Sequence, residues 1–214
     1  MLKSSRFFGS CVVAGAVLFL ITMVMLHLLR PDYTLRRFLS EYAVGPFGFL
    51  GTAAIYELSA TFLMLLFGLR LSVHPSGILT TSCVLLGVVI ISICVCAVFP
   101  TDLMPPDGSR PTFTSLTRAG IIHIVSSSLL FESLIAVSLT LPSAYKRDEK
   151  WRSFSHTTLF LGFLILALFV GLILVPFNLK GLVQRGMVLV ILIWLLLTGL
   201  HLRQSISSTH GTAA

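Results

Sequence analysis

Long apolar runs alternate with short polar segments along the whole chain. Each run is long enough to cross a hydrocarbon core of about 30 Å as an α-helix. Pro31, Pro100, Pro142 and Pro176 are among the prolines at or beyond the ends of these runs, where water or lipid headgroups satisfy the backbone. The pattern predicts an all-α integral membrane bundle of six transmembrane helices in a single domain over residues 1–214. The predicted spans lie near residues 10–29, 47–69, 78–99, 119–141, 156–175 and 185–203.

Composition agrees with this pattern. The 214 residues are 56% hydrophobic and only 11% charged, and the mean hydropathy is +0.98, which excludes an ordinary soluble domain. The net charge of +7 would suggest nucleic acid in a soluble protein. Here the basic residues lie between the apolar runs, which indicates topology signals and headgroup attraction, so we expect membrane lipids and not nucleic acid as partners.

The basic residues also bear on orientation. An even number of spans places both termini on one side, and with the N-terminus inside, eight Lys and Arg residues lie in inner segments and seven in outer ones. The dense basic cluster at residues 145–152 lies in one short loop of the kind that obeys the positive-inside rule. We therefore expect a multi-pass protein of the cell membrane with both termini cytoplasmic.

The first outer segment has a helical pattern. Leu35, Phe38, Leu39 and Tyr42 recur at helical spacing, opposite a polar set that includes Glu41. This spacing suits a short helix lying in the membrane interface, and the alternative is an irregular loop with arginines that reach the headgroups.

Two acidic residues, Glu57 and Glu132, lie deep inside predicted spans. Charged groups are costly at that depth, so such residues are candidates for function. Small residues on the same helix faces predict that both carboxyls point into the bundle. One hypothesis is a proton or cation relay or a polar pocket for a ligand; the other is two neutral carboxyls that hydrogen-bond to Ser, Thr or Tyr56.

Histidines provide further candidates. Asp102 and His123 can form an acid–base pair, half of a metal site, or a structural hydrogen bond that ties a loop to a helix; two ligands are too few to predict a metal. Haem is considered because His27 and His123 lie near the outer side while His156 and His201 lie near the inner side. Most of these histidines lie at span ends, where imidazoles are ordinary, so no cofactor is predicted.

Catalytic signatures of known enzyme classes are absent from the sequence. We therefore favour a non-enzymatic membrane protein that binds or senses a lipid, or acts as a subunit of a membrane-protein complex. A proton- or ion-coupled carrier that uses Glu57 and Glu132 is the second hypothesis, and haem-based electron transfer is the third.

Four short motifs lie at the ends of the predicted spans. They are Ser40-Glu41-Tyr42 with Gly45, Phe99-Pro-Thr-Asp102, Gly120-Ile-Ile-His123 and Gly181-Leu-Val-Gln-Arg185. These motifs resemble those of an uncharacterised bacterial and archaeal membrane family, domain of unknown function 998. The resemblance extends over nearly the whole chain, and it implies six spans. More distantly, the chain is similar to eukaryotic six-span proteins linked to lipid handling.

The motifs suggest that Glu41, Asp102, His123 and Arg185 converge on one outer-facing polar site. Arg185 can offer a bidentate fork to Glu41, to Asp102 or to a lipid phosphate. The alternative is that the arginine only reaches the headgroups while Asp102 caps a loop.

Overall fold

The regular structure of this protein is helical. The computed structural model describes residues 2–33, 35–105 and 111–204, and no strand occurs among them. Six of the helices are long and apolar enough to cross a membrane, which confirms the predicted all-α six-helix membrane bundle. They are α1 (Leu2–Leu29), α2 (Gly48–Ser72), α3 (Gly77–Val98), α4 (Arg118–Tyr145), α5 (Phe154–Leu174) and α6 (Lys180–Gln204), with the short 3₁₀ helices η1 (Leu39–Ala43), η2 (Phe113–Ser115) and η3 (Phe177–Leu179).

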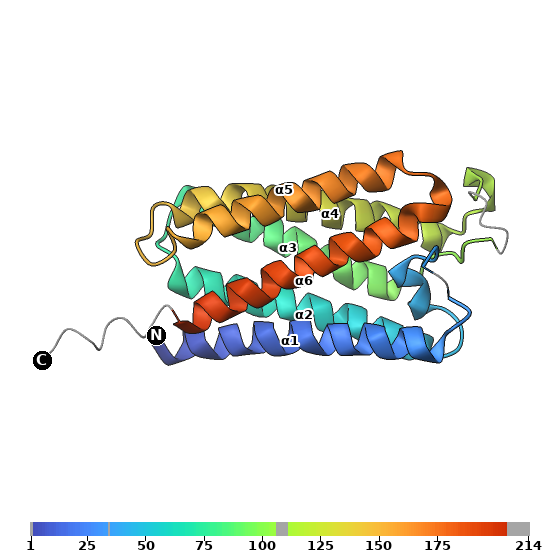
Figure 1. The fold of residues 1–214 in the computed structure, drawn as a ribbon, viewed down its shortest axis with the longest axis horizontal. Helices are drawn as coiled ribbons and strands as arrows, with labels where there is room; N and C mark the ends of the chain where they lie inside the picture. The colour runs from blue at the N-terminus through green and yellow to red at the C-terminus, as the bar shows by residue number, and fades with distance from the viewer. Residues whose placement is uncertain (1, 34, 106–110, 205–214) are drawn as a thin grey trace, which may run out of the picture.

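The six long helices form a ring. Each helix packs against its neighbours along the chain, and α6 returns to pack against α1 (Figure 1). The start of α1 and the end of α6 lie together with residues 73–76 and 146–153; we call this the terminal end. The opposite end carries η1, η2 and η3, and we call it the loop end.

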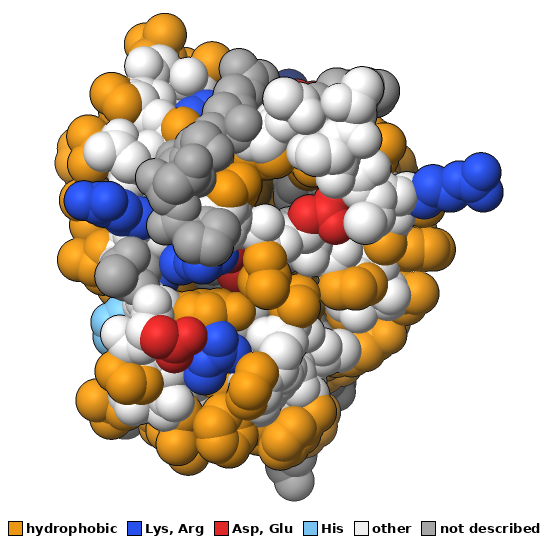
Figure 2. Space-filling view, turned by 90° about the vertical axis from the view of Figure 1, so that its right-hand side faces the viewer, with side chains coloured by type: hydrophobic (Ala, Val, Ile, Leu, Met, Phe, Trp, Pro, Cys, Tyr) orange, Lys and Arg blue, Asp and Glu red, His pale blue; other side chains and the backbone are white. Residues whose placement is uncertain are grey.

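The outside of the ring is apolar. Large hydrophobic side chains are exposed on every long helix, for example Leu28, Phe49 and Leu174, which are more than two-thirds exposed. Trp194, Phe62 and other apolar side chains fill the core. Lys, Arg, Asp and Glu side chains are visible on the loop end among apolar side chains, and some of the basic ones lie at its edge (Figure 2). This distribution is the one expected of a bundle surrounded by lipid chains.

Helix α4 continues through Pro142 to Tyr145. The expectation that Pro142 ends the span is therefore wrong. The proline lies in the last turn of α4, where its missing N–H removes a single hydrogen bond to the preceding turn and the remaining residues can stay helical. Helices α1 and α6 also begin earlier than expected, at Leu2 and Lys180, because helix ends that carry charged residues can extend beyond the hydrocarbon core.

The first connection at the loop end is not an interfacial helix. Among its described residues the one helical segment is the short helix η1, in which Glu41 and Tyr42 are 0% and 1% exposed. Tyr42 packs against Leu26 and Tyr33 in a small separate core. The amphipathic pattern predicted an exposed side chain for Glu41, and this was wrong. The Glu41 carboxylate lies inside the protein, where an arginine and backbone N–H groups of other residues donate hydrogen bonds to it.

Candidate functional site

Glu41 holds two loops of the loop end together. Its carboxylate accepts hydrogen bonds from Arg37 Nη1 at 2.8 Å, from the backbone N–H of Phe38 at 2.9 Å and from that of Met104 at 3.1 Å. Arg37 Nη1 also donates to the carbonyl oxygen of Met104 at 2.6 Å. The ion pair thus ties the α1–α2 connection to the α3–α4 connection. Because the carboxylate is fully buried, its charge depends on these partners.

Arg185 attaches the same α1–α2 connection to α6. Its Nη1 donates to the carbonyl oxygens of Leu35 at 3.2 Å, Arg37 at 2.5 Å and Gly181 at 3.0 Å. Among the residues the structure describes, no ion pair joins Arg185 to Glu41 or Asp102. The Nη2 atom of Arg185 is buried without a hydrogen-bond partner in that part of the chain.

Asp102 holds the residue that caps helix α4. Its carboxylate accepts hydrogen bonds from the Thr117 backbone N–H at 2.9 Å and from the Thr117 hydroxyl at 2.7 Å. The Thr117 hydroxyl in turn accepts from the N–H of Gly120 at 3.0 Å, as an N-cap residue does. A side chain at Gly120 would overlap the Asp102 carboxylate. The glycine is therefore required for the close approach of this loop.

His123 joins α4 to the end of α3. Its Nδ1 hydrogen-bonds to the carbonyl oxygen of Phe99 at 2.8 Å, and the imidazole is 5% exposed. The hydroxyl of Ser127, one turn further along α4, donates to the carbonyl oxygen of Ile124 and not to His123. The geometry of His123 is that of a structural tie between loop and helix.

A large cavity lies under these loops. Its volume is about 740 Å³, within the range of small-molecule sites, and residues of all six long helices line it. Most of its wall is apolar. Asp102 and His123 line this cavity, whereas Glu41 and Arg185 do not. The convergence of all four residues on one outer-facing site stays a prediction.

Helices α4 and α5 contribute much of the cavity wall. These helices touch closely toward the terminal end, where a side chain at Gly162 would lie 2.9 Å from Ser138 Oγ. Toward the loop end, the cavity-lining residues Val125 of α4 and Ile173 of α5 are 62% and 60% exposed. The two helices therefore expose apolar side chains on both sides of the cavity.

The two deep carboxyls lie in different surroundings. Glu132 is exposed and lines the cavity. Glu57 is half-buried, does not line the cavity, and lies beside the α1 backbone at Phe19. Its Oε1 atom is buried without a partner in the described part of the chain.

Three of the four histidines considered for haem, His27, His123 and His201, make hydrogen bonds within the protein. His27 Nδ1 lies 2.6 Å from the Tyr42 hydroxyl, and His201 Nε2 lies 3.0 Å from the carbonyl oxygen of Lys150. His156 is exposed. Within the described ranges, no group of three or more His, Cys, Asp or Glu residues is arranged to hold a metal. Haem binding remains the third hypothesis.

Burial and nearby arginines shift the pKa values of two side chains at the loop end. Burial raises the pKa of Tyr42, and the nearby Arg185 partly offsets that rise. Arg30 donates to Asp32 through two nitrogens at 2.9 and 3.0 Å and lowers the pKa of that exposed carboxyl. Arg30 also lies over the Tyr33 ring at 3.8 Å.

Sequence reasoning missed two important residues. Arg37 is the ion-pair partner of Glu41, and the spacing of four residues between them was a usable signal. Gln184 accepts a hydrogen bond from the Leu39 N–H at 2.8 Å and lines the cavity; it lies within the Gly181–Arg185 motif, but only Arg185 of that motif was expected in the site.

A family model described as "Protein of unknown function (DUF998)" matches residues 13–201. No curated protein and no solved structure matches the chain. The family match covers most of the sequence and confirms the resemblance inferred from the motifs. The chain therefore belongs to this family of multi-pass membrane proteins of unknown function.

Proposed function

We propose that this member of the family binds a lipid or lipid-like amphiphile in the cavity under the loop end. The observation that carries the proposal is the cavity of about 740 Å³ in the middle of the helix ring. A membrane protein with an empty apolar cavity of this size would lose the dispersion contacts that a packed core provides, so an apolar occupant is favoured.

The polarity of the wall matches an amphiphile. Polar side chains line the cavity near the loops, among them Asp102, Lys180 and Gln184. Apolar side chains such as Leu58 and Phe131 line it elsewhere. A ligand with a polar head under the loops and an apolar tail between the helices satisfies both parts of the wall.

Access is proposed to be lateral. Val125 and Ile173 are exposed on the two sides of the cavity, and both side chains are apolar. An opening between α4 and α5 that is bordered by apolar side chains admits a lipid directly from the membrane, so its acyl chain does not pass through water.

The proposal is tested with a photoreactive fatty-acid or phospholipid analogue in reconstituted protein. We expect cross-links to peptides of α4 and α5 that line the cavity. Ser128→Phe fills the cavity from α4 and should lower cross-linking strongly. Ser143→Phe introduces the same side chain at an exposed position of α4 outside the cavity, and it should leave cross-linking unchanged. Equal cross-linking in Ser128→Phe and the parent protein would refute the proposal.

A carrier is the second candidate, and the observation that favours it is the Glu132 side chain in the cavity wall. In a proton-coupled carrier, Glu132→Gln should abolish ligand-dependent proton uptake into proteoliposomes while cross-linking persists. In a binding protein without transport, neither the parent nor the variant should show such uptake.

A further inference from the structure

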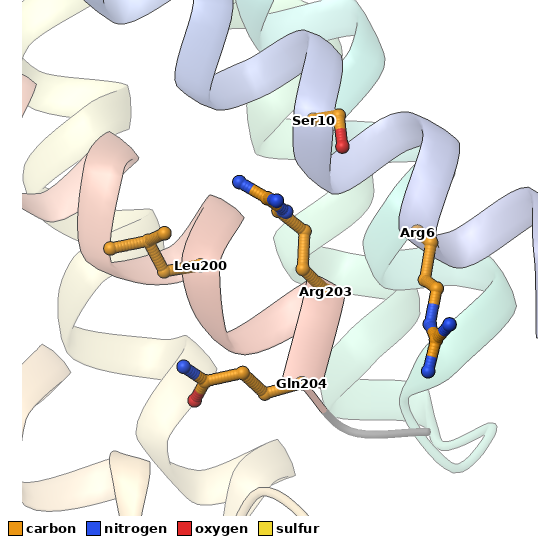
Figure 3. Close-up of a pocket in the computed structure, with 5 residues that line it drawn as sticks. All are labelled: Arg6, Ser10, Leu200, Arg203 and Gln204. Carbon is orange, nitrogen blue, oxygen red and sulfur yellow. The ribbon is translucent and has the colours of Figure 1, made fainter. Parts of the chain in front are cut away.

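A second hollow lies at the terminal end, on the opposite side of the molecule from the cavity. It has a volume of about 400 Å³ and lies between α1 and α6 (Figure 3). Its lining is Arg6 and Ser10 of α1 with Leu200, Arg203 and Gln204 of α6.

The position of this hollow is fixed by close backbone packing. A Cβ atom at Gly9 would lie 2.6 Å from the carbonyl oxygen of Gly199, so the two helices touch without intervening side chains. The Ser5 hydroxyl also donates to the carbonyl oxygen of Leu202 at 3.2 Å. Because Ser10 follows Gly9 and Arg203 lies one turn beyond Gly199, this contact holds the polar side chains of both helices beside the hollow.

The polar side chains of the lining favour an anion. Two guanidinium groups offer planar sets of N–H donors, and the hydroxyl of Ser10 and the amide of Gln204 can add further donors. No carboxylate is among the described lining residues. Arg203 extends toward α1 on the side of Ser10, whereas the Arg6 side chain points toward the end of the bundle, so the two guanidinium groups flank the hollow (Figure 3). Phosphate oxygens match this combination of positive charge and hydrogen-bond donors.

An apolar strip continues from the hollow toward the middle of the membrane. Val17 lies two turns beyond Ser10 on the same face of α1, and Ile193 lies two turns before Leu200 on α6. These three apolar side chains, Val17, Ile193 and Leu200, are 42%, 38% and 39% exposed. A ligand whose phosphate lies in the hollow can place an apolar chain along this strip.

We propose that the hollow binds the phosphate group of an anionic phospholipid, with an acyl chain along the strip between α1 and α6. This site is separate from the cavity at the loop end and does not depend on the function proposed for it. Free phosphate would use the same donors but would gain nothing from the apolar strip.

The test is native mass spectrometry of the full chain titrated with phosphatidylglycerol or phosphatidylcholine. We expect phosphatidylglycerol to bind more tightly, and Arg6→Gln with Arg203→Gln to weaken that binding by about tenfold or more. The matched control is Arg147→Gln with Arg152→Gln, which removes the same charge from exposed side chains elsewhere at the terminal end. It should change binding by less than about twofold.

A further variant tests the shape of the site without a charge change. Ser10→Leu fills the hollow with an apolar side chain and should also weaken phosphatidylglycerol binding. Equal losses in the two double variants would show attraction to diffuse surface charge and would overturn the site. Displacement of the phospholipid by an equal concentration of inorganic phosphate would overturn the lipid assignment.

Discussion

Replacing Glu41 by alanine should undock the two loops that meet at the loop end. The change removes the acceptor of three hydrogen bonds, from Arg37 and from the backbone N–H groups of Phe38 and Met104. It leaves these donors without their carboxylate partner in a place where Glu41 is fully buried. Loss of one partner of a buried ion pair costs about 3–5 kcal/mol.

The expected value lies toward the lower part of that range. The Arg37 side chain is 21% exposed, so water can satisfy part of its charge after the substitution. The two backbone donors have less access to water, and each unsatisfied donor costs about 1–3 kcal/mol. We therefore expect the free energy of unfolding to fall by about 3–4 kcal/mol.

The measurement is denaturant titration in mixed lipid–detergent micelles, combined with hydrogen exchange of the loop amides. Exchange at Phe38 and Met104 should become faster in Glu41→Ala. Asp32→Asn is the control, because it removes the other ion pair of the loop end, in which Asp32 is 62% exposed. If Glu41→Ala is no more destabilising than Asp32→Asn, the buried ion pair does not hold the loops together.

Three further predictions concern packing, pH and orientation. Gly120→Ala should destabilise the protein by about 1–3 kcal/mol, because the new methyl group displaces the Asp102 carboxylate that holds the N-cap residue Thr117. Gly87→Ala should not destabilise it, because a Cβ at Gly87 meets no atom within 4 Å. Thermal unfolding of both variants checks this difference. Burial raises the pKa of Tyr42 above its ordinary value of 10.0, so the unfolded chain loses this proton first. The free energy of unfolding should then be highest below about pH 10 and fall as the pH rises. Between about pH 9 and 11, the unfolding midpoint of the Tyr42→Phe variant should fall less than that of the parent protein. Equal falls would contradict the burial argument. Cysteines introduced at Thr114 and Ser153 should react with impermeant reagents from outside and inside the cell respectively, and the reverse result would overturn the predicted orientation.

The sequence was informative about helices because the membrane imposes a simple rule. Every span needs a continuous apolar run, so hydropathy alone located six helices and their connections. Where a prediction from the sequence failed, the cause lies in the position of the residue in the finished structure. Pro142 is tolerated because it lies in a last turn, and Glu41 is buried because Arg37 and two backbone N–H groups satisfy it.

The candidate site was only partly accessible from sequence. Asp102 and His123 were identified from their motifs, and both line the cavity. The cavity itself is lined by residues of all six long helices, and the close approach of Gly162 to Ser138 is one of the contacts that place α4 and α5 beside each other. That contact joins residues on separate helices and leaves no local signature in the amino-acid pattern.

The ring of helices also has a consequence for how the protein is made. Five helix interfaces join consecutive helices, so each can form as soon as the next span enters the membrane. The interface between α1 and α6 is different, since it unites two spans that are separated by the other four. Until α6 is inserted, α1 presents Ser5 and the bare backbone at Gly9 without the partners they have in the finished ring. The last helix is therefore the one whose arrival closes the molecule.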